Sequence, residues 1–290
     1  MESRLLPTDN AKVFDETPCQ LGEGVFWHPL REQLFWFDII ARRLMWHEGP
    51  DLRVWQFKEY TTAAGWVDRD NLLIATERGL FEFEIATGRR RLIVPLEDAD
   101  AGTRSNDGRA DPWGGFWIGT MGLNAEPGAG AIYRYFRGEL RKLISSVSIS
   151  NAICFAPDRS AAYYSDTATQ QVMRQPLDES GWPTGVAALH IDLRGSASFP
   201  DGAVADAAGC LWLAEWGAGR IGRYDRQGQL ISAISLPCLQ PTCPAFGGKN
   251  LHTLFVTSAS VNITPPMSSS GATFRIETDI EGVAEPRIIL

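Results

Sequence analysis

Four polar residues along the chain could together bind a cation. Glu23, Asn106, Asn151 and Asp201 each precede a small residue by one or two positions. Two carboxylates and two amides offer oxygen ligands, which hard cations such as calcium and magnesium prefer. Buried together, these groups would also need such a partner, because unpaired polar and charged groups are costly to bury. We therefore expect a cation site if the fold brings the four side chains together.

The segments that must position these residues have the pattern of short strands. Six runs rich in β-branched and aromatic residues are bounded by turn residues, which predicts strands at 34–38, 72–76, 116–120, 162–166, 211–215 and 254–258. Long stretches with apolar residues at helical spacing are absent from the sequence. We therefore expect few helices.

These strands recur with a period. The residues that open the successive repeats are Glu23, Ala64, Asn106, Asn151, Asp201 and Ala245. Their intervals are about 40–50 residues, and such a period with several strands per unit is the signature of a β-propeller. In a propeller the innermost strand of each blade lines a central channel, so the opening residues would converge on one axis. A β-sandwich is the alternative, but it gives no reason for the period.

We expect an all-β fold, a six-bladed β-propeller with a central-channel metal site, as a single domain over residues 1–290. The last repeat is short of strands unless residues 273–276 complete it, and residues 12–14 could add a strand to the same blade. Such closure would remove an exposed sheet edge. At this chain length neither a metal nor a disulfide is required for folding.

Ordinary turns are the competing interpretation of the polar residues. Asn106-Asp107-Gly108 and Pro200-Asp201-Gly202 are common turn tripeptides, because Asn and Asp tolerate unusual backbone angles. Their occurrence in the same register as Glu23 and Asn151 favours a functional site instead.

Composition and charge exclude several classes of protein. The formal net charge of -8 does not fit a nucleic-acid binder, and no apolar run approaches the ~18 residues that a membrane helix needs. The first residues lack the apolar region of a secretory signal. The five cysteines are odd in number and mostly far apart, which favours a reducing compartment. We therefore expect a cytoplasmic protein with neither a nucleic-acid nor a membrane partner.

Short segments from about residue 20 to residue 282 carry a resemblance to a known family. They include Leu21–Trp27, Arg104–Gly108, Phe116–Met121, Ser150–Ile153, Pro200–Gly202, Leu211–Ala214, Phe246–Gly248 and Leu254–Ala259. In order and spacing they resemble the senescence marker protein/regucalcin/gluconolactonase (SGL) family. That resemblance implies a six-bladed propeller with one divalent metal on its axis.

The resemblance also implies roles for individual residues. Three of them would bind the metal: Glu23, Asn151 and Asp201. Three others would contact the substrate: Arg104, Asn106 and Glu126. The chain departs from the family pattern at two places, where Ala152 replaces a usual glycine and Cys243 replaces a small hydroxyl residue. Neither departure removes a ligand.

The activity that the resemblance implies is metal-dependent hydrolysis of a sugar lactone. The metal would polarise the lactone carbonyl, and a carboxylate would activate water as general base. Asp201 is the candidate base, and the Arg104 guanidinium suits sugar hydroxyls or a carboxylate.

Two other functions remain open, namely a calcium-binding regulatory protein without turnover and a scaffold for protein partners. Calcium is the first expectation for the metal, with zinc, manganese, magnesium and iron as alternatives. The sequence identifies neither the lactone nor the oligomeric state.

Overall fold

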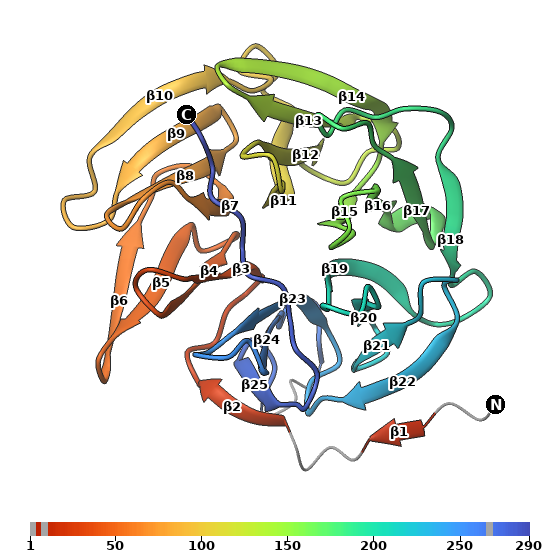
Figure 1. The fold of residues 1–290 in the computed structure, drawn as a ribbon. Helices are drawn as coiled ribbons and strands as arrows, with labels where there is room; N and C mark the ends of the chain where they lie inside the picture. The colour runs from red at the N-terminus through yellow and green to blue at the C-terminus, as the bar shows by residue number, and fades with distance from the viewer. Residues whose placement is uncertain (1–3, 7–10, 265–268) are drawn as a thin grey trace.

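Six sheets form a ring in the computed structural model, which describes residues 4–6, 11–264 and 269–290 (Figure 1). The fold is a six-bladed β-propeller, so the predicted fold class is confirmed. Within the described ranges the one helical element is a 3₁₀ turn, η2 (Thr167–Thr169). The same part of the chain contains no helix long and apolar enough to cross a membrane.

Each blade has four main strands, and its first strand lies nearest the axis (Figure 1). The first three blades are β3 (Gly22–His28), β4 (Gln33–Asp38), β5 (Arg43–Glu48), β6 (Asp51–Gln56); β7 (Thr61–Trp66), β8 (Asn71–Thr76), β9 (Gly79–Glu84), β10 (Arg90–Pro95); and β11 (Thr103–Ala110), β12 (Phe116–Gly122), β13 (Gly130–Phe136), β14 (Glu139–Val147). The fourth and fifth blades are β15 (Ser150–Phe155), β16 (Ala161–Asp166), β17 (Gln171–Pro176), β18 (Ala188–Asp192); and β19 (Phe199–Ala205), β20 (Leu211–Trp216), β21 (Arg220–Tyr224), β22 (Leu230–Ser235).

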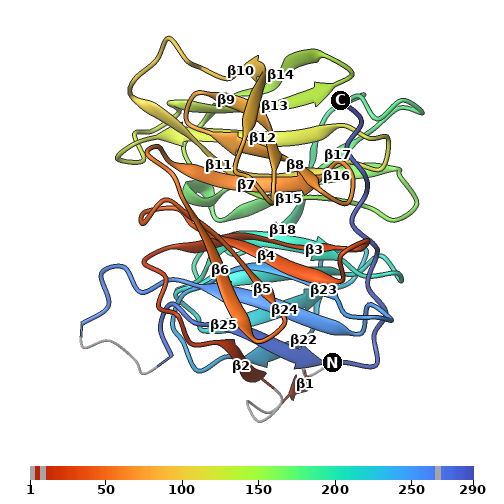
Figure 2. The same cartoon turned by 90° about the vertical axis from the view of Figure 1, so that its left-hand side faces the viewer.

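The last blade combines both ends of the chain. It contains β23 (Pro241–Gly247), β24 (Thr253–Ser258), β25 (Thr273–Glu277) and, as its outer strand, β2 (Ala11–Asp15). A further N-terminal strand, β1 (Arg4–Leu6), pairs in parallel with β22 of the preceding blade. These strands lie at the same side of the ring in Figures 1 and 2. The N-terminal strands thus cover sheet edges that would otherwise be open for pairing with another chain.

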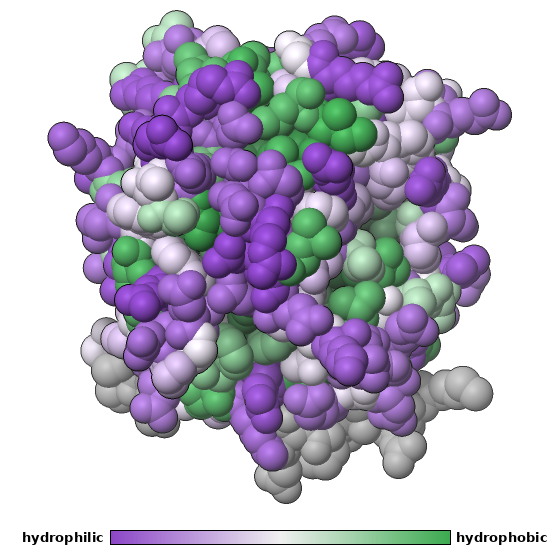
Figure 3. Space-filling model, turned by 60° about the vertical axis from the view of Figure 1, so that its left-hand side comes forward, coloured by the Kyte–Doolittle hydropathy of each residue, from purple (hydrophilic) through white to green (hydrophobic). Residues whose placement is uncertain are grey.

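In the first and second blades the inner strands are far more buried than the outermost strands. Every residue of β12 is buried, whereas most residues of the outer strands β6 and β10 are exposed or half-buried. Apolar side chains fill the space between neighbouring blades; one such cluster contains Phe35 and Phe37 of the first blade with Ile74 of the second. On the face in Figure 3, hydrophilic side chains predominate and hydrophobic ones form small separate patches.

A register shift near the start of every inner strand shapes the channel. The pairing shifts between Glu23 and Phe26, Thr61 and Ala63, Ser105 and Gly108, Asn151 and Cys154, Pro200 and Ala203, and Pro241 and Pro244. Such β-bulges insert an extra residue and redirect nearby side chains. In this protein Glu23, Asn106, Asn151 and Asp201 all lie within or directly beside these bulges.

Because of the bulges, two of the residues predicted to open a repeat, Ala64 and Ala245, are wrong. Ala64 pairs with Ile74 and Ala245 with Phe255, beyond the shift in each strand, so neither is equivalent to Glu23. The equivalent positions are Thr61 and Pro241, the last paired residues before the shift.

The prediction that Glu23, Asn106, Asn151 and Asp201 occupy equivalent positions is also off by one residue for Asn106 and Asp201. They lie inside their bulges, whereas Glu23 and Asn151 immediately precede theirs. The cause is the extra residue at each bulge, which a count along the sequence does not reveal.

The C-terminal residues 282–290 cross one end of the channel, as the dark blue segment in Figures 1 and 2 shows. Backbone hydrogen bonds attach this tail to two blades: Ile288 N donates to Trp66 O at 2.9 Å, and Ile289 N donates to Gly114 O at 2.8 Å. Ile288 is fully buried in the apolar cluster between these blades. The tail is therefore an integral part of the fold.

A buried ion pair joins the tail to the channel wall. Arg109, on the inner strand β11, pairs with Glu285 of the tail, and both side chains are less than a tenth exposed. Arg109 Nη2 also donates to Pro244 O at 3.1 Å. Removing either charge of a buried ion pair is strongly destabilising, because the other charge then stays buried without compensation.

We predict that Glu285→Gln lowers the free energy of unfolding by about 3 kcal/mol, because it leaves the Arg109 guanidinium without its counter-charge. Urea unfolding followed by circular dichroism measures the change. Glu281→Gln, at an exposed position of the same chain end, is the matched control and should change little. Arg109→Met combined with Glu285→Gln should recover part of the loss, and equal midpoints for the two single variants would contradict this role of the pair.

Candidate functional site

Glu23 and Asp201 meet inside the channel. Their carboxyl groups lie close enough for each to shift the pKa of the other, and both residues are about 5% exposed. Burial, and then the negative charge of Asp107, raise the pKa of Glu23. Burial, and then the charge of Glu23, raise the pKa of Asp201 well above its usual range. The two groups can be ionised together only if a positive charge compensates them.

The bulges explain why these side chains face one another. Gly24, directly after Glu23, has a φ of 56°, and a Cβ atom at Gly24 would approach Thr62 O to 2.3 Å. Glycine adopts this left-handed backbone without steric cost. Its N–H donates to Glu23 Oε2 at 2.9 Å, which holds the carboxylate in place.

Ala152 occupies the corresponding position after Asn151. Its φ is also 56°, so the same left-handed bulge forms here on a residue that has a Cβ. An alanine in this conformation costs roughly 1–2 kcal/mol more than a glycine. The departure from the family pattern at Ala152 therefore leaves the backbone geometry unchanged.

Hydrogen bonds orient the Asn151 amide towards the channel. Its Nδ2 donates to Thr167 Oγ1 at 2.8 Å, and that hydroxyl donates to Pro200 O at 2.8 Å. Its Oδ1 accepts from Asn106 Nδ2 at 3.2 Å. The amide nitrogen is therefore occupied on one side, which leaves the oxygen as the group that faces the other channel residues.

Arg104 and Asn106 form one hydrogen-bonded unit at the site. Arg104 Nη1 donates to Asn106 Oδ1 and to Ser105 O, both at 2.8 Å. Burial lowers the pKa of Arg104 to about 10, so the guanidinium stays charged at neutral pH. It lies 5.9 Å from the ring centroid of Tyr60. The unit places a fixed cation beside the carboxyl pair.

Glu126 lies in the exposed loop after β12. Its Oε2 accepts from Asn124 N at 3.1 Å and its Oε1 from Asn124 Nδ2 at 2.8 Å. The loop begins at Gly122, which pairs with Thr103, the residue before Arg104. Glu126 therefore belongs to the same end of the channel as Arg104, and its substrate contact stays a prediction.

Asp107 is a third buried carboxyl group, which the sequence analysis did not single out. It lies in the same bulge as Asn106, is 4% exposed, and accepts from Ile153 N at 2.8 Å. Burial raises its pKa to about 6, and its charge raises the pKa of both Glu23 and Asp201. Its position directly after Asn106, in a run of polar residues, is the sequence feature that could have identified Asp107 as a site residue.

Hydroxyl groups complete the ring where the sequence suggested alanines. Thr62 Oγ1 donates to Ser105 Oγ at 2.9 Å, and Thr242 Oγ1 donates to Thr257 Oγ1 at 2.9 Å. Thr62 and Thr242 lie inside the bulges of these two strands, one position after Thr61 and Pro241.

The donor set of the site suits a hard cation. Among the described residues no three or more His, Cys, Asp or Glu side chains gather as a metal-binding group, so a third ligand must come from an amide such as that of Asn151. Burial raises the pKa of the nearby Cys243 thiol well above its usual range, which disfavours a thiolate ligand. Carboxylate and amide oxygens fit calcium or magnesium better than soft metals.

Comparisons with known proteins identify the family of the chain. The family model described as SMP-30/Gluconolactonase/LRE-like region matches residues 21–260. A 6-deoxy-6-sulfogluconolactonase of Pseudomonas putida is 34% identical, over 96% of this chain and 98% of its own. An L-arabinolactonase of Azospirillum brasilense is 31% identical, over 97% and 96%.

A solved structure shares nearly the whole fold. The calcium-binding protein regucalcin of Agrobacterium tumefaciens has 39% sequence identity and a TM-score of 0.96, with 99% of this chain and 100% of that chain covered.

We predict that the protein, kept in chelator, becomes less stable as the pH rises from about 4 to 7. The folded state raises the pKa of Glu23 from 4.5 to about 7 and that of Asp107 from 3.8 to about 6. The folded protein therefore keeps these protons to a higher pH than the unfolded chain does. Each group then lowers the free energy of unfolding by about 1.4 kcal/mol per pH unit between its two pKa values.

Urea midpoints at pH 5, 6 and 7 measure this dependence. Asp107→Asn should flatten it, and Asp98→Asn at an exposed position should not. A midpoint that rises with pH in chelator would contradict the assignment.

Proposed function

The chain belongs to the SMP-30/gluconolactonase/LRE-like family, and we propose on this basis that it is a metal-dependent hydrolase that opens a sugar lactone. The observation that carries the proposal is the buried Glu23–Asp201 carboxyl pair beside the Arg104 guanidinium. A buried pair of like charges supports a cation site, and a fixed positive side chain beside it supports a bound polar substrate.

Glu23, Asn151 and Asp201 would hold the divalent cation, with calcium as the first candidate and magnesium, manganese, zinc and iron as alternatives. The cation would polarise the lactone carbonyl and stabilise the negative charge that develops when water adds. The tethered amide of Asn151 and the bulge at Gly24 support this assignment, because both hold a ligand side chain in one orientation.

Asp201 would act as general base. Its carboxylate would take a proton from the attacking water while the water oxygen bonds to the lactone carbonyl carbon. The ring C–O bond then breaks, and the proton passes to the ring oxygen, which becomes a hydroxyl group. The product is the open hydroxy acid, so no covalent enzyme intermediate is required. A positioned carboxylate that accepts and returns the proton contributes on the order of 10²–10⁴-fold to the rate as a general base.

Arg104, Asn106 and Glu126 would hold the sugar. Arg104 uses Nη1 for its hydrogen bonds to Asn106 and Ser105. A guanidinium has five N–H donors, so the others remain for ligand oxygens. The C-terminal tail crosses the opposite end of the channel, so a substrate would enter from the Arg104 end.

The relatives support the class of substrate. Two of them are named for lactones of sugars or sulfo-sugars, so we propose a sugar lactone for this chain. A panel of hexono-, pentono- and sulfo-substituted lactones, assayed with a pH indicator on metal-stripped protein reloaded with single ions, would identify both lactone and metal.

A calcium-binding protein without turnover is the second candidate. The regucalcin structure, described as calcium-binding, favours it, and the same three ligands would serve both functions. Arg104 distinguishes the two, because a simple ion site gains nothing from a neighbouring positive charge. A protein scaffold leaves the buried carboxyl groups unexplained.

We predict that Asp201→Asn lowers kcat for lactone hydrolysis at saturating metal by at least about 100-fold, because Asn cannot accept a proton at neutral pH. Circular dichroism should show an unchanged fold. Asp98→Asn serves as the control with normal turnover. Wild-type rates in Asp201→Asn would refute the assigned base, and absence of hydrolysis by the wild type with every ion would favour the second candidate.

We predict that Arg104→Ala lowers kcat/KM by about 10- to 100-fold, the effect of losing one charge-assisted hydrogen bond or more. Metal affinity, measured by calorimetry, should change little. Arg78→Ala removes an exposed arginine from the neighbouring blade and is the matched control. A variant that lost the metal yet kept normal turnover in its loaded fraction would exclude a substrate role for Arg104.

A further inference from the structure

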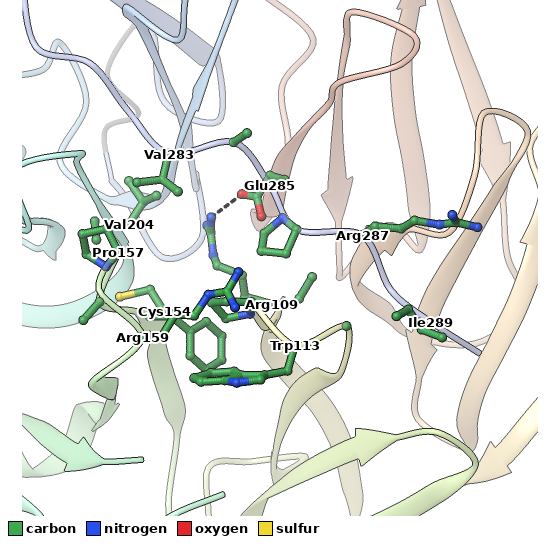
Figure 4. A pocket seen from close by; sticks show the side chains of 18 residues that line it. Arg109, Trp113, Cys154, Pro157, Arg159, Val204, Val283, Glu285, Arg287 and Ile289 are labelled. Carbon is green, nitrogen blue, oxygen red and sulfur yellow. Dashed lines mark hydrogen bonds and ion pairs between the residues drawn. The ribbon is translucent and has the colours of Figure 1, made fainter. Parts of the chain in front are cut away.

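A cavity lies at the end of the channel opposite the proposed catalytic site, between the C-terminal tail and the ends of the inner strands (Figure 4). Its volume is about 510 Å³, which is within the range of small-molecule sites. Arg109, Cys154 and Val204 contribute to its wall from β11, β15 and β19. Arg109 follows Asn106 by three residues on the same strand, so the cavity is roughly 10 Å along the strand from the proposed catalytic site.

The charged groups around this cavity have an excess of positive charge. Three arginines and one carboxylate line it: Arg109, Arg159, Arg287 and Glu285. Glu285 is already paired with Arg109. Arg287 Nε donates to Val67 O at 2.6 Å, and its side chain extends away from Glu285 in Figure 4. Two of the cavity's positive charges thus have no counter-charge within its lining.

Arg109 has unused hydrogen-bond donors at the cavity. Its side chain is 9% exposed, and its bonds to other described residues are one from Nη1 to Glu285 and one from Nη2 to Pro244 O. A guanidinium has five N–H donors, so several remain for a ligand.

Arg159 supplies the second cationic group. It belongs to the turn between β15 and β16, its side chain reaches over the cavity (Figure 4), and within the described ranges that side chain forms no hydrogen bond or ion pair. An anion placed between Arg109 and Arg159 would receive charge-assisted hydrogen bonds from both, which are the stronger class of such bonds.

The remaining wall is apolar. The apolar lining consists of Trp113, Phe155, Val204, Val283 and Ile289. Of these, Val283 and Ile289 are exposed although they are large hydrophobic residues. An apolar wall with a few polar groups at one side is the usual construction of a small-molecule site. It favours a ligand with a hydrophobic body over a sugar.

We propose that this cavity binds a small organic anion, a carboxylate or phosphate with an aromatic or aliphatic body. The anionic group contacts Arg109 and Arg159, and the body packs against Trp113 and Phe155. The site is separate from the proposed lactone site, since it lies on the opposite side of the Arg109–Glu285 ion pair.

The probe pair 3-phenylpropanoate and its uncharged amide tests the site by calorimetry on the full chain. The acid should bind with a dissociation constant on the order of 1 mM, as expected for a ligand of this size, and the amide at least tenfold more weakly. Arg159→Ala should weaken binding of the acid by about tenfold. Arg137→Ala is the matched control, because Arg137 is also an exposed arginine at positive φ in a strand turn.

Two further variants locate the bound probe. Ala284→Trp places a large side chain at the cavity from an exposed tail position and should abolish binding, with circular dichroism as the folding control. Arg104→Ala should leave binding unchanged. Equal binding of acid and amide, unchanged binding in Arg159→Ala, or loss of binding in Arg104→Ala would each overturn the proposal.

Discussion

Carboxyl groups of like charge resist being held together away from water, and this constraint organises the channel of the propeller. Glu23, Asp201 and Asp107 are all buried, burial raises the pKa of each, and the charge of Asp107 raises the pKa of the other two further. Further along β11, Arg109 brings a positive charge, which Glu285 of the tail balances. The charges alternate in sign from the carboxyl cluster to the tail. A cation at the carboxyl end would complete the compensation, which is why the proposed function and the stability of the fold depend on the same groups.

The β-bulges are the means by which ordinary strands present these groups. A regular inner strand would alternate its side chains between two faces, and neighbouring polar residues could not both face the axis. The shift after Glu23 and after Asn151, with left-handed residues at Gly24 and Ala152, removes that restriction. Asn106 and Asp107 share one bulge, so one strand contributes both a substrate-binding candidate and a buried carboxyl group.

The blade count and several site residues could be predicted from the sequence, because the second strands are short, apolar runs that recur and the polar residues stand beside small ones. The register of the inner strands could not be predicted. An inserted residue at a bulge leaves no compositional trace, so Ala64 and Ala245 were assigned in place of Thr61 and Pro241. The Arg109–Glu285 pair joins residues 176 positions apart, and nothing local in either segment indicates its partner. Long-range pairing of this kind becomes visible only in three dimensions.

The sharing of one blade by β2 and β25 has a consequence for the order of synthesis. At about 5–20 residues per second, the N-terminal strand leaves the ribosome roughly 10–50 s before its partner exists. During that time β2 must remain unpaired without joining another nascent chain. Its composition suits the delay, since Lys12 and its neighbours are mostly solvent-facing in the finished blade and a charged edge discourages pairing between chains. The ring therefore closes only after β25 has been synthesised, and the last blade is the part of the protein whose assembly a slow or stalled ribosome would postpone.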